Sequence, residues 1–297
     1  MSPHVAVAAV DLGKSRCRLS VMGPDGRQTY AGAGAPGLAT ATGVDTALAV
    51  IVPLLQDAGR IDELGVGAAG AWNAPQAALE LAHRLAEETG ARVTVASDVV
   101  TAHAGALEGA RGTLLIAGTG AVALGTDDDG VRLVDGWGPD LGDLGSGSWI
   151  GREGVRAALR FRDGLGEQTM LTEAIRAHIA PASDAISWLA GDIPVARLLA
   201  TAAPLVLDAA AAGDAVATRV ASEAVRLLTA TAVAASGASD VVIHGGLTDH
   251  AWFRAELERS LTAAGRATAP AAGDALDGAA LLARRTDMPH ERFVHRA

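Results

Sequence analysis

Cysteine, lysine and aromatic residues are scarce in this chain of 297 residues. Cys17 is its one cysteine, Lys14 its one lysine, and aromatic residues make up 3% of the sequence. One cysteine excludes an internal disulfide and a multi-cysteine zinc or iron-sulfur site within one chain. The chain also lacks an uncharged apolar run of the roughly 20 residues that a membrane span needs. Its start shows no export signal, and we therefore expect a cytoplasmic protein with no membrane partner.

Positive charge is also in short supply. The formal net charge is -10, and the basic residues form no patch or tail. This balance opposes a phosphate backbone, so nucleic acid is not an expected partner.

The pattern along the chain predicts an α/β protein of two domains, because strand-like runs alternate with alanine-rich segments of helical period. We place an N-terminal domain at 1–111 and a C-terminal domain with a helical insertion at 112–297, whose last helix could pack back on the first domain. The expected strands are 5–10, 17–22, 28–31, 64–68, 92–96, 113–117, 121–125, 131–134 and 241–244. The expected helices are 45–57, 75–89, 149–162, 169–179, 195–211, 214–236, 253–264 and 275–285, and a further helix is expected to begin after Asp98.

A strand, a tight glycine turn and a returning strand occur once in each half of the chain. The turns are at 11–15 and 118–120, and such paired turns can present backbone N–H groups to one polyphosphate. Two nearby motifs are not what they resemble. Gly13-Lys14-Ser15 follows Ala8 where a P-loop needs glycine, and a strand rather than a helix comes next; the glycines of 32–37 precede no clear helix either.

Asp11 and Asp98 each stand at the end of a predicted buried strand. Asp11 opens the first glycine turn, where a carboxylate can hold magnesium directly or through water, or can simply cap the turn. Asp98 lies at the edge where open α/β sheets bind ligands, but it could also be an ordinary helix N-cap.

The loop at 136–151 is unusually rich in glycine. Glycine of this density costs conformational entropy, and it commonly lets a backbone approach a ligand, although a long flexible loop is the alternative. Asp143 can accept hydrogen bonds from sugar hydroxyls there, and Trp137 or Trp149 can offer a flat apolar face.

Taken in order, these motifs resemble the BadF/BadG/BcrA/BcrD ATPase family, and within it the N-acetylglucosamine kinases. The resemblance spans nearly the whole chain, and the Gly-Trp-Gly loop is its most specific part. The matching motifs are Asp-x-Gly-x-Ser-x-x-Arg (Asp11, Gly13, Ser15, Arg18), Ser97-Asp98, 117–120, Gly-Trp-Gly (136–138) with Gly-Asp-x-Gly-Ser-Gly (142–147), His244-Gly245-Gly246 and Asp277-Gly278-Ala279.

The resemblance implies two ribonuclease-H-like domains of the actin, sugar kinase and Hsp70 superfamily, with the active site in the cleft between them. It implies an ATP-dependent sugar kinase with Mg²⁺, a small-molecule sugar as partner, and a homodimer. Asp98 would be the catalytic base and would contact the sugar, and Asp11 would order magnesium through water. The remaining implied contacts are Gly13, Lys14, Ser15, Gly118, Thr119 and Gly120 with phosphates, Gly245 and Gly246 with adenosine, and Trp137, Gly138, Asp143, Gly145 and Ser146 with the sugar.

Three leucines depart from the family's pattern. Leu12 replaces a glycine of the first turn, Leu38 stands where amino-sugar kinases usually carry Asn, and Leu144 stands in place of Glu. These changes leave N-acetylglucosamine open against other amino, acylated or muramyl sugars. The alternatives are a non-catalytic ATP-binding scaffold, an ATPase activator of another enzyme and a sugar-responsive regulator. This sequence shows neither the cysteines that such an activator needs for its iron-sulfur cluster nor the DNA-binding extension that such a regulator needs.

Overall fold

The computed structural model describes residues 6–23, 26–56 and 58–297, and the chain forms two compact units. Unit 1 comprises the described residues of Met1–Arg111 with Asp129–Val131 and Pro270–Ala297. Unit 2 comprises Gly112–Asp128 and Arg132–Ala269. The expected strand 5–10 and helix 45–57 each include one residue outside the described part of the chain, Val5 and Asp57 respectively.

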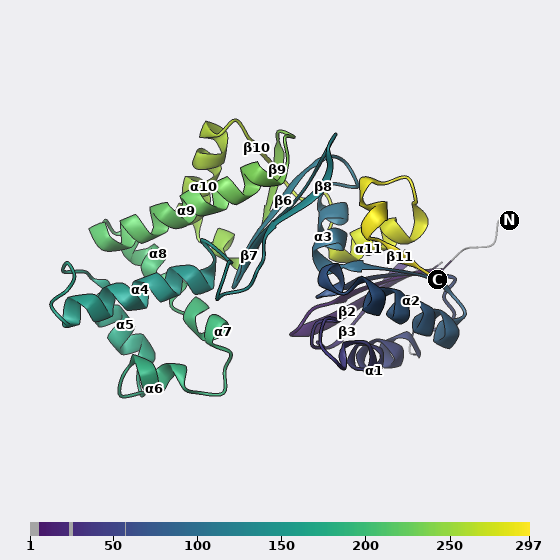
Figure 1. Ribbon diagram of the computed structural model, residues 1–297, viewed down its shortest axis with the longest axis horizontal. Coiled ribbons are helices and arrows are strands. Elements are labelled where there is room, and N and C mark those ends of the chain that lie inside the picture. The colour runs from purple at the N-terminus through teal and green to yellow at the C-terminus, as the bar shows by residue number, and fades with distance from the viewer. Residues whose placement is uncertain (1–5, 24–25, 57) are drawn as a thin grey trace. The chain divides into compact units, whose positions relative to one another are not determined.

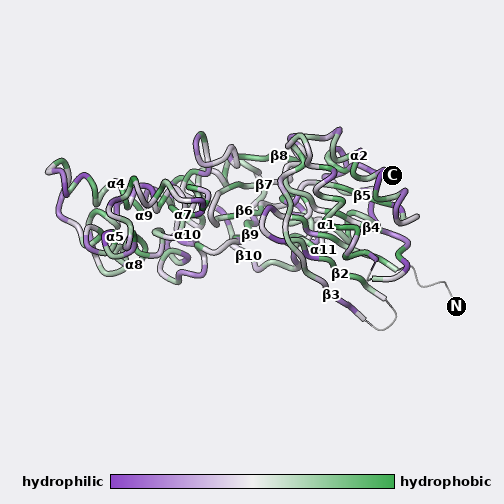
Figure 2. The backbone as a smooth tube through the Cα atoms, turned by 90° about the horizontal axis from the view of Figure 1, so that it is seen from below, coloured by the Kyte–Doolittle hydropathy of each residue, from purple (hydrophilic) through white to green (hydrophobic). Residues whose placement is uncertain are grey.

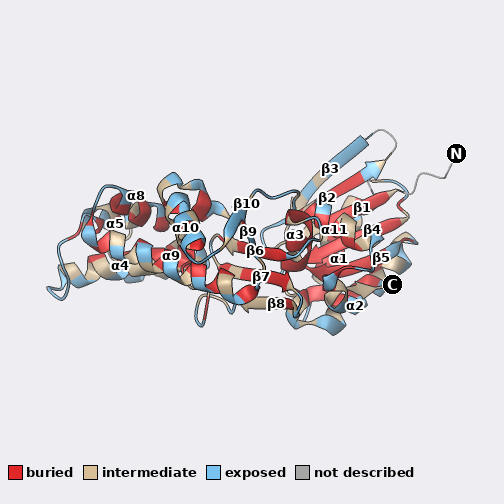
Figure 3. Cartoon of the chain, turned by 90° about the horizontal axis from the view of Figure 1, so that it is seen from above, coloured by how far each residue is buried: buried red, intermediate tan, exposed pale blue. Residues whose placement is uncertain are grey.

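Unit 1 contains a six-stranded sheet in the order β11-β5-β4-β1-β2-β3. β1, β2 and β3 form an antiparallel meander, and β4 and β5 continue the sheet parallel to β1. The central strands are buried and largely hydrophobic, whereas β3 is mostly exposed and is polar toward its N-terminal end (Figures 2 and 3). The strands are β1 (Val7–Leu12), β2 (Arg16–Gly23), β3 (Gly26–Ala33), β4 (Glu63–Ala68), β5 (Arg92–Ser97) and β11 (His295–Arg296).

Helices cover both faces of this sheet (Figure 1). The alternation of β1 sends Ala8 and Val10 into a core with α1 (Gly43–Gln56) and α2 (Pro75–Thr89). Ala9 points the other way, onto α11 (Ala275–Arg284), which packs against α3 (Asp98–Ala106). Two single-turn 3₁₀ helices, η1 (Ala71–Asn73) and η3 (Pro289–Phe293), complete the unit.

Unit 2 repeats the strand order of unit 1. Its sheet runs β10-β9-β6-β7-β8, so in both units the first three strands form a meander and the fourth pairs with the first. The bounds are β6 (Gly112–Ala117), β7 (Ala121–Asp127), β8 (Gly130–Asp135), β9 (Asp240–His244) and β10 (Ala267–Ala269). In both units this meander begins with the strand-turn-strand device that the sequence repeats.

Helices between β8 and β9 form most of the core of unit 2. They are α4 (Gly147–Arg162), α5 (Leu171–Ile179), α6 (Ala185–Leu189), α7 (Val195–Ala200), α8 (Ala203–Ala211) and α9 (Ala215–Ala235), with η2 (Gly246–Asp249) and α10 (Ala251–Ala263) following β9.

The prediction of a single helix at 195–211 is wrong, because the helix is interrupted at residues 201–202, between α7 and α8. Pro204 lies in the first turn of α8, where its missing N–H costs nothing, but the same ring would clash inside a continuous helix. No single helix in the described ranges is long and apolar enough to cross a membrane; one pair, Val195–Ala211 with Ala215–Ala235, passes that test jointly but bends by 114°.

The C-terminal segment packs tightly into unit 1, and glycine makes that approach possible. A Cβ at Gly278 of α11 would lie 1.8 Å from the carbonyl oxygen of Thr101, and one at Gly105 would lie 1.9 Å from that of Asp274. On the strand beneath, a Cβ at Gly65 would lie 2.0 Å from the Ala279 carbonyl oxygen. The two helices and the sheet therefore meet backbone against backbone.

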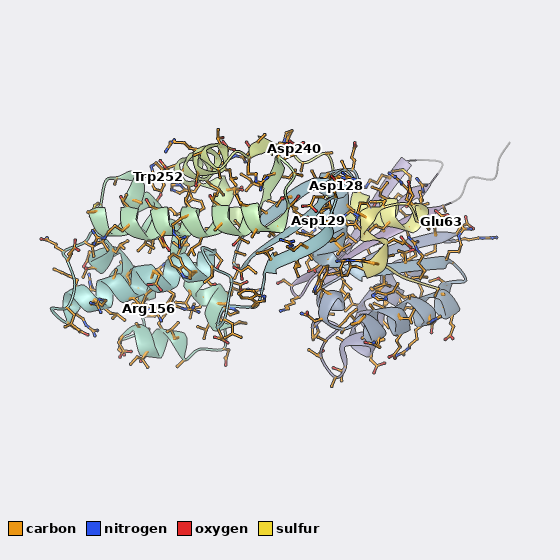
Figure 4. The ribbon with its side chains drawn as sticks, turned by 45° about the horizontal axis from the view of Figure 1, so that its top comes forward. Glu63, Asp128, Asp129, Arg156, Asp240 and Trp252 are labelled. Carbon is orange, nitrogen blue, oxygen red and sulfur yellow. The ribbon has the colours of Figure 1, made fainter. Side chains whose placement is uncertain are left out.

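Side chains fasten the same segment at its edges. His290 Nε2 and His103 Nδ1 lie 2.9 Å apart with both rings buried, and burial, with the neighbouring His103, lowers the pKa of His290 to about 3. Glu63, labelled in Figure 4, contacts Arg92 of β5 and Arg284 at the end of α11. His290 is thus uncharged at neutral pH, and the charged contacts of Glu63 reach arginines that are exposed.

We predict that Gly278→Ala will lower the free energy of unfolding by about 1–3 kcal/mol, because the added methyl must push α11 away from α3. Chemical denaturation of both proteins measures this difference. Gly23→Ala is the matched control, since a Cβ at Gly23 meets nothing within 4 Å. Equal stabilities of Gly278→Ala and the unaltered protein would show that the helix crossing is not as tight as described.

Candidate active site

The carboxyl ends of three parallel strands bring two predicted aspartates to one edge of the unit 1 sheet. Leu12 of β1 is in register with Ala68 of β4, and Ala68 is in register with Ser97 of β5. Asp11 immediately precedes this row and Asp98 immediately follows it. Open α/β sheets bind ligands at this edge, so the register itself gathers the two carboxylates.

Asp98 is the first residue of α3 and is partly buried. Its Oδ1 accepts hydrogen bonds from the Ser97 hydroxyl at 2.9 Å and from the Val99 N–H at 2.9 Å. Burial raises the pKa of Asp98 above its ordinary value, and the negative charge of Asp11 adds to the rise, while the two hydrogen bonds oppose it. A carboxylate with a raised pKa is a stronger base than a solvated one, which suits proton abstraction.

Asp11 is held by an arginine from the neighbouring strand. Arg18 faces Asp11 across the β1–β2 pair, and its Nε and Nη2 donate to Asp11 Oδ2 at 3.0 and 2.7 Å. Its Nη1 donates to Asp274 at 2.8 Å, which is the N-cap of α11. Burial alone would raise the pKa of Asp274, but the Asp277 N–H and the Arg18 guanidinium hold it below its usual value. Arg18 thus ties the first turn to α11.

The first glycine turn is compact and open on one side. The Gly13 N–H donates to the Arg16 carbonyl at 3.0 Å, and a Cβ at Gly13 would approach only that oxygen, at 3.5 Å. Gly34 packs beneath the turn, where a Cβ would lie 2.4 Å from the Gly13 carbonyl oxygen. Lys14 and Ser15 are exposed at its tip. The predicted phosphate-binding residues of unit 1 therefore lie on the outer side of the turn, next to Asp11.

The departing leucines of unit 1 belong to its core. Leu12 and Leu38 are each 2% exposed and lie in the cluster shared with α1 and α2. The Leu38 N–H donates to the Ala69 carbonyl at 2.8 Å, which fastens this loop to the end of β4. Neither side chain is available to a ligand.

In unit 2 the second glycine turn lies against the start of α4. The Gly118 N–H donates to the Gly120 carbonyl at 2.9 Å, while Gly118 and Thr119 accept from the N–H groups of Gly147 at 2.8 Å and Ser148 at 3.1 Å. A Cβ at Gly118 would meet nothing within 4 Å, so one side of the turn is open. The carbonyl groups of Gly118 and Thr119 thus point toward α4 and accept hydrogen bonds from its first turn.

Gly245 lies beside the second glycine turn, and Gly246 is the next residue along the chain. Gly245 has φ of +115°, and a Cβ there would lie 2.5 Å from the Ala117 carbonyl oxygen. The register of Ile116 with His244 explains the contact, because the residues just past both strands must pass each other closely. The two predicted nucleotide segments of unit 2 are therefore adjacent.

Asp143 contacts the same turn from the glycine-rich loop. Its Oδ1 accepts from the Ala121 N–H at 3.3 Å, and a Cβ at Gly120 would lie 2.9 Å from its Oδ2. Trp137 is 67% exposed, so its ring is accessible, and Gly138 adopts φ of +87° in open surroundings. The structure thus brings the predicted sugar carboxylate into contact with the predicted phosphate turn.

Ser146 and Gly145 have structural roles that differ from the predicted contact with a sugar. The Ser146 side chain is fully buried, and its hydroxyl accepts from the Trp149 N–H at 3.2 Å as the N-cap of α4. Gly145 has φ of +79°, and a Cβ there would lie 2.6 Å from the Ala224 carbonyl oxygen. Ser146 thus caps α4, and Gly145 allows the loop backbone to approach α9 closely.

Two residues of this region were not given roles from the sequence. Arg18 appeared only as a letter of a motif, although the two-residue alternation of strands could have placed it opposite Asp11. Asp135 carried no signal, since it looks like an ordinary strand-ending aspartate. It is 4% exposed and accepts hydrogen bonds from three backbone N–H groups of the glycine-rich loop.

Two α/β units of one strand order, each with a glycine turn after its first strand, define a protein of the actin-like ATPase and sugar kinase fold. The glucokinase of Streptomyces griseus, solved with glucose and AMPPNP, shares this fold at a TM-score of 0.56 and 20% identity, over 94% of this chain and 99% of that one.

The model of the BadF/BadG/BcrA/BcrD ATPase family matches residues 10–283, and the chain belongs to that family. A candidate N-acetylglucosamine kinase of Chromobacterium violaceum has a TM-score of 0.74 and 26% identity, over 94% of this chain and 98% of that one. The N-acetylmuramic acid/N-acetylglucosamine kinase of Clostridium acetobutylicum is 33% identical over 140 residues, which are 46% of each protein. The two curated relatives are matched over less than half of their length.

We predict that Asp98→Asn will not lower the melting temperature at pH 7. Because the folded state raises the pKa of Asp98, this group favours folding most when it is protonated, and that contribution is lost as the pH rises through the folded pKa. At any pH above that folded pKa, the unaltered protein bears the cost of a partly buried charge that Asn lacks. Thermal melts from pH 4 to 8 test this: any gain of the variant shrinks as the pH falls. A clear loss of stability at pH 7 contradicts it.

Proposed function

We propose that this protein transfers the γ-phosphoryl group of ATP to a hydroxyl of a small amino sugar, such as N-acetylglucosamine, glucosamine or a related N-acyl sugar. The observation that carries the proposal is Asp98, a partly buried carboxylate of raised pKa at the ligand-binding edge of a sheet, beside Asp11. Membership of an ATPase family and the kinases among the relatives support it.

Asp98 is the general base of this proposal. Phosphoryl transfer passes through a loose transition state, so the protein contributes alignment and charge neutralisation more than covalent chemistry. Asp98 accepts the proton of the attacking hydroxyl, and its Oδ1 bonds to Ser97 and Val99 fix its orientation for that task.

Each of the two glycine turns has an open side that suits a phosphate group. At Gly13 and Gly118 a side chain would find little or nothing nearby, so each turn leaves room at its backbone. We assign Gly13, Lys14 and Ser15 of unit 1 and Gly118, Thr119 and Gly120 of unit 2 to the phosphates of one ATP, with Gly245 and Gly246 at its adenosine. Residues of unit 1 and of unit 2 would then contribute to one reaction.

Asp11 fits magnesium held through water. A carboxylate oxygen is the ligand type that Mg²⁺ prefers, and both bonds from Arg18 end on Oδ2, so the carboxylate is oriented in advance. Bound magnesium would supply charge neutralisation to the phosphates. Arg18 and Lys14 place further positive charge beside the same edge.

The sugar would contact Asp98, Asp143, Trp137 and Gly138. Asp143 supplies acceptor oxygens for hydroxyl groups, and the exposed ring of Trp137 supplies a flat apolar face. A cytoplasmic location and a homodimer belong to the same proposal, and sedimentation of the purified protein measures the second.

An ATP-binding scaffold is the second candidate, because Leu12, Leu38 and Leu144 replace polar or glycine positions. An activator that needs an iron-sulfur cluster is not favoured. Cys17 is buried, and burial, with the nearby charge of Asp11, raises its thiol pKa to about 11, which makes it a poor cluster ligand.

We predict that one sugar of a small panel will raise ATP consumption well above the rate without sugar. The panel comprises glucosamine, N-acetylglucosamine, N-acetylmuramate, N-acetylmannosamine and glucose, each with magnesium. ADP release measured by a coupled assay reports the rate, and mass spectrometry identifies the phosphorylated sugar. ATP binding without stimulation by any amino sugar would favour the scaffold.

We also predict that Asp98→Asn will lower turnover by about 10²- to 10⁴-fold, because Asn cannot accept the hydroxyl proton. Nucleotide affinity, measured by calorimetry, is expected to stay near that of the unaltered protein, since Asp98 is not assigned to ATP. Asp45→Asn is a surface control, because Asp45 is an exposed residue of α1 paired with Arg84. Near-normal turnover of Asp98→Asn would remove Asp98 from this role.

A further inference from the structure

Asp135, the last residue of β8, lies at the base of the glycine-rich loop and faces into it. Its Oδ1 accepts from the N–H groups of Gly136 at 2.8 Å and Asp143 at 2.7 Å, and its Oδ2 accepts from Leu144 at 2.9 Å. One buried carboxylate thus joins the first residue of the loop to two residues that follow seven or eight positions later. Such charge-assisted bonds are stronger than neutral ones.

The loop is built to admit this carboxylate. A Cβ at Gly142 would lie 2.3 Å from Asp135 Oδ1, so any side chain there would expel it. Asp135 itself has φ of +62° and Asp143 has φ of +54°, a left-handed conformation that residues with a Cβ adopt infrequently. Three hydrogen bonds to one buried carboxylate supply the constraint that holds both residues there.

The bond from the Asp143 N–H is the one that bears on the reaction. It fixes the backbone of Asp143 while the Asp143 side chain accepts from Ala121 and lies against Gly120 of the phosphate turn. The position of the Asp143 carboxylate therefore depends on Asp135 as well as on the turn. Leu144, where the family resemblance predicts Glu, meets the same anchor through its backbone rather than its side chain.

We propose that Asp135 is a positioning residue for sugar binding, which sets the Asp143 carboxylate by holding the backbone of the loop. The proposal rests on the proposed function of Asp143. Asp135 does not touch the sugar, and its effect reaches the substrate only through the loop. The carboxylate of Asp143 in the loop is thus held in place by the carboxylate of Asp135 in the preceding strand.

The first test compares Asp135→Asn and Asp135→Ala with the unaltered protein. Asn can keep the two bonds of one oxygen but presents an N–H₂ group in place of the other oxygen, and Ala removes all three acceptor bonds. We expect the KM for the sugar to rise by about tenfold in Asp135→Asn and further in Asp135→Ala, with the KM for ATP changed less than threefold.

Asp214→Asn is the matched control, because Asp214 is a similarly buried carboxylate of unit 2 that accepts N–H bonds from Met170 and Ala217 far along the chain from the loop. Its loss is expected to lower the melting temperature and to leave the sugar KM unchanged. If Asp135→Asn behaves in the same way, with lower stability and an unaltered sugar KM, Asp135 is only structural and the proposal is overturned.

A double-mutant cycle separates action through Asp143 from a direct effect. If Asp135 works by placing Asp143, the sugar KM of Asp135→Asn with Asp143→Asn will equal that of Asp143→Asn alone. Additive effects on the sugar KM would overturn the proposal.

Hydrogen exchange gives a readout that does not need a substrate. The peptide covering 136–147 is expected to exchange faster in Asp135→Asn and Asp135→Ala and to be unaffected in Asp214→Asn. Unchanged exchange in both Asp135 variants would overturn the anchoring. If the unaltered protein phosphorylates no sugar, the proposed function fails, and exchange alone then decides whether Asp135 anchors the loop.

Discussion

Backbone contacts closer than any side chain allows are the constraint on which this structure depends. In unit 1, α11 reaches α3 and β4 only because Gly278, Gly105 and Gly65 lack a Cβ, and this contact attaches the end of the chain to the sheet that carries Asp11 and Asp98. In unit 2, Gly120 and Gly142 leave room for the carboxylates of Asp143 and Asp135. The glycines thus determine which positions are open to these carboxylates. Ordering the glycines on folding costs conformational entropy, which opposes this stabilisation.

The two carboxylates of unit 1 lie in opposite electrostatic settings. Asp98 is partly buried, and its pKa is raised by burial and then by the charge of Asp11, whereas Asp11 is paired with Arg18. A group that is to accept a proton profits from the first setting, and a group that is to remain charged profits from the second. Because Arg18 also bonds to Asp274, the setting of Asp11 depends on the docking of α11 as well as on the β1–β2 register.

Local patterns were enough to predict most strands of both units and the position of Asp98 at the end of one of them, because strand alternation and glycine turns are short-range signals. Contacts distant in sequence were predicted less well. The last helix was expected to be able to pack on the first domain, but not the close contact of Gly278 with Thr101 that holds it there. The site roles of Arg18 and Asp135 depend on partners that local propensity does not reveal. Local propensity also did not reveal that the Ser146 hydroxyl caps α4 and contacts the Ser148 hydroxyl.

Two of the three leucines are best understood from burial. Leu12 and Leu38 fill the core of unit 1, so each exchanges a group that could face a ligand for apolar packing. The loop around Leu38 stays in place because its N–H bonds to Ala69 at the end of β4. If a sugar binds as proposed, the hydrogen bonds that a leucine cannot make at position 38 must come from backbone groups or from unit 2. There Asp143 is held by hydrogen bonds with Asp135 and Ala121 and packs against Gly120. Discrimination among amino sugars would then depend more on the glycine-rich loop of unit 2 than on side chains of unit 1.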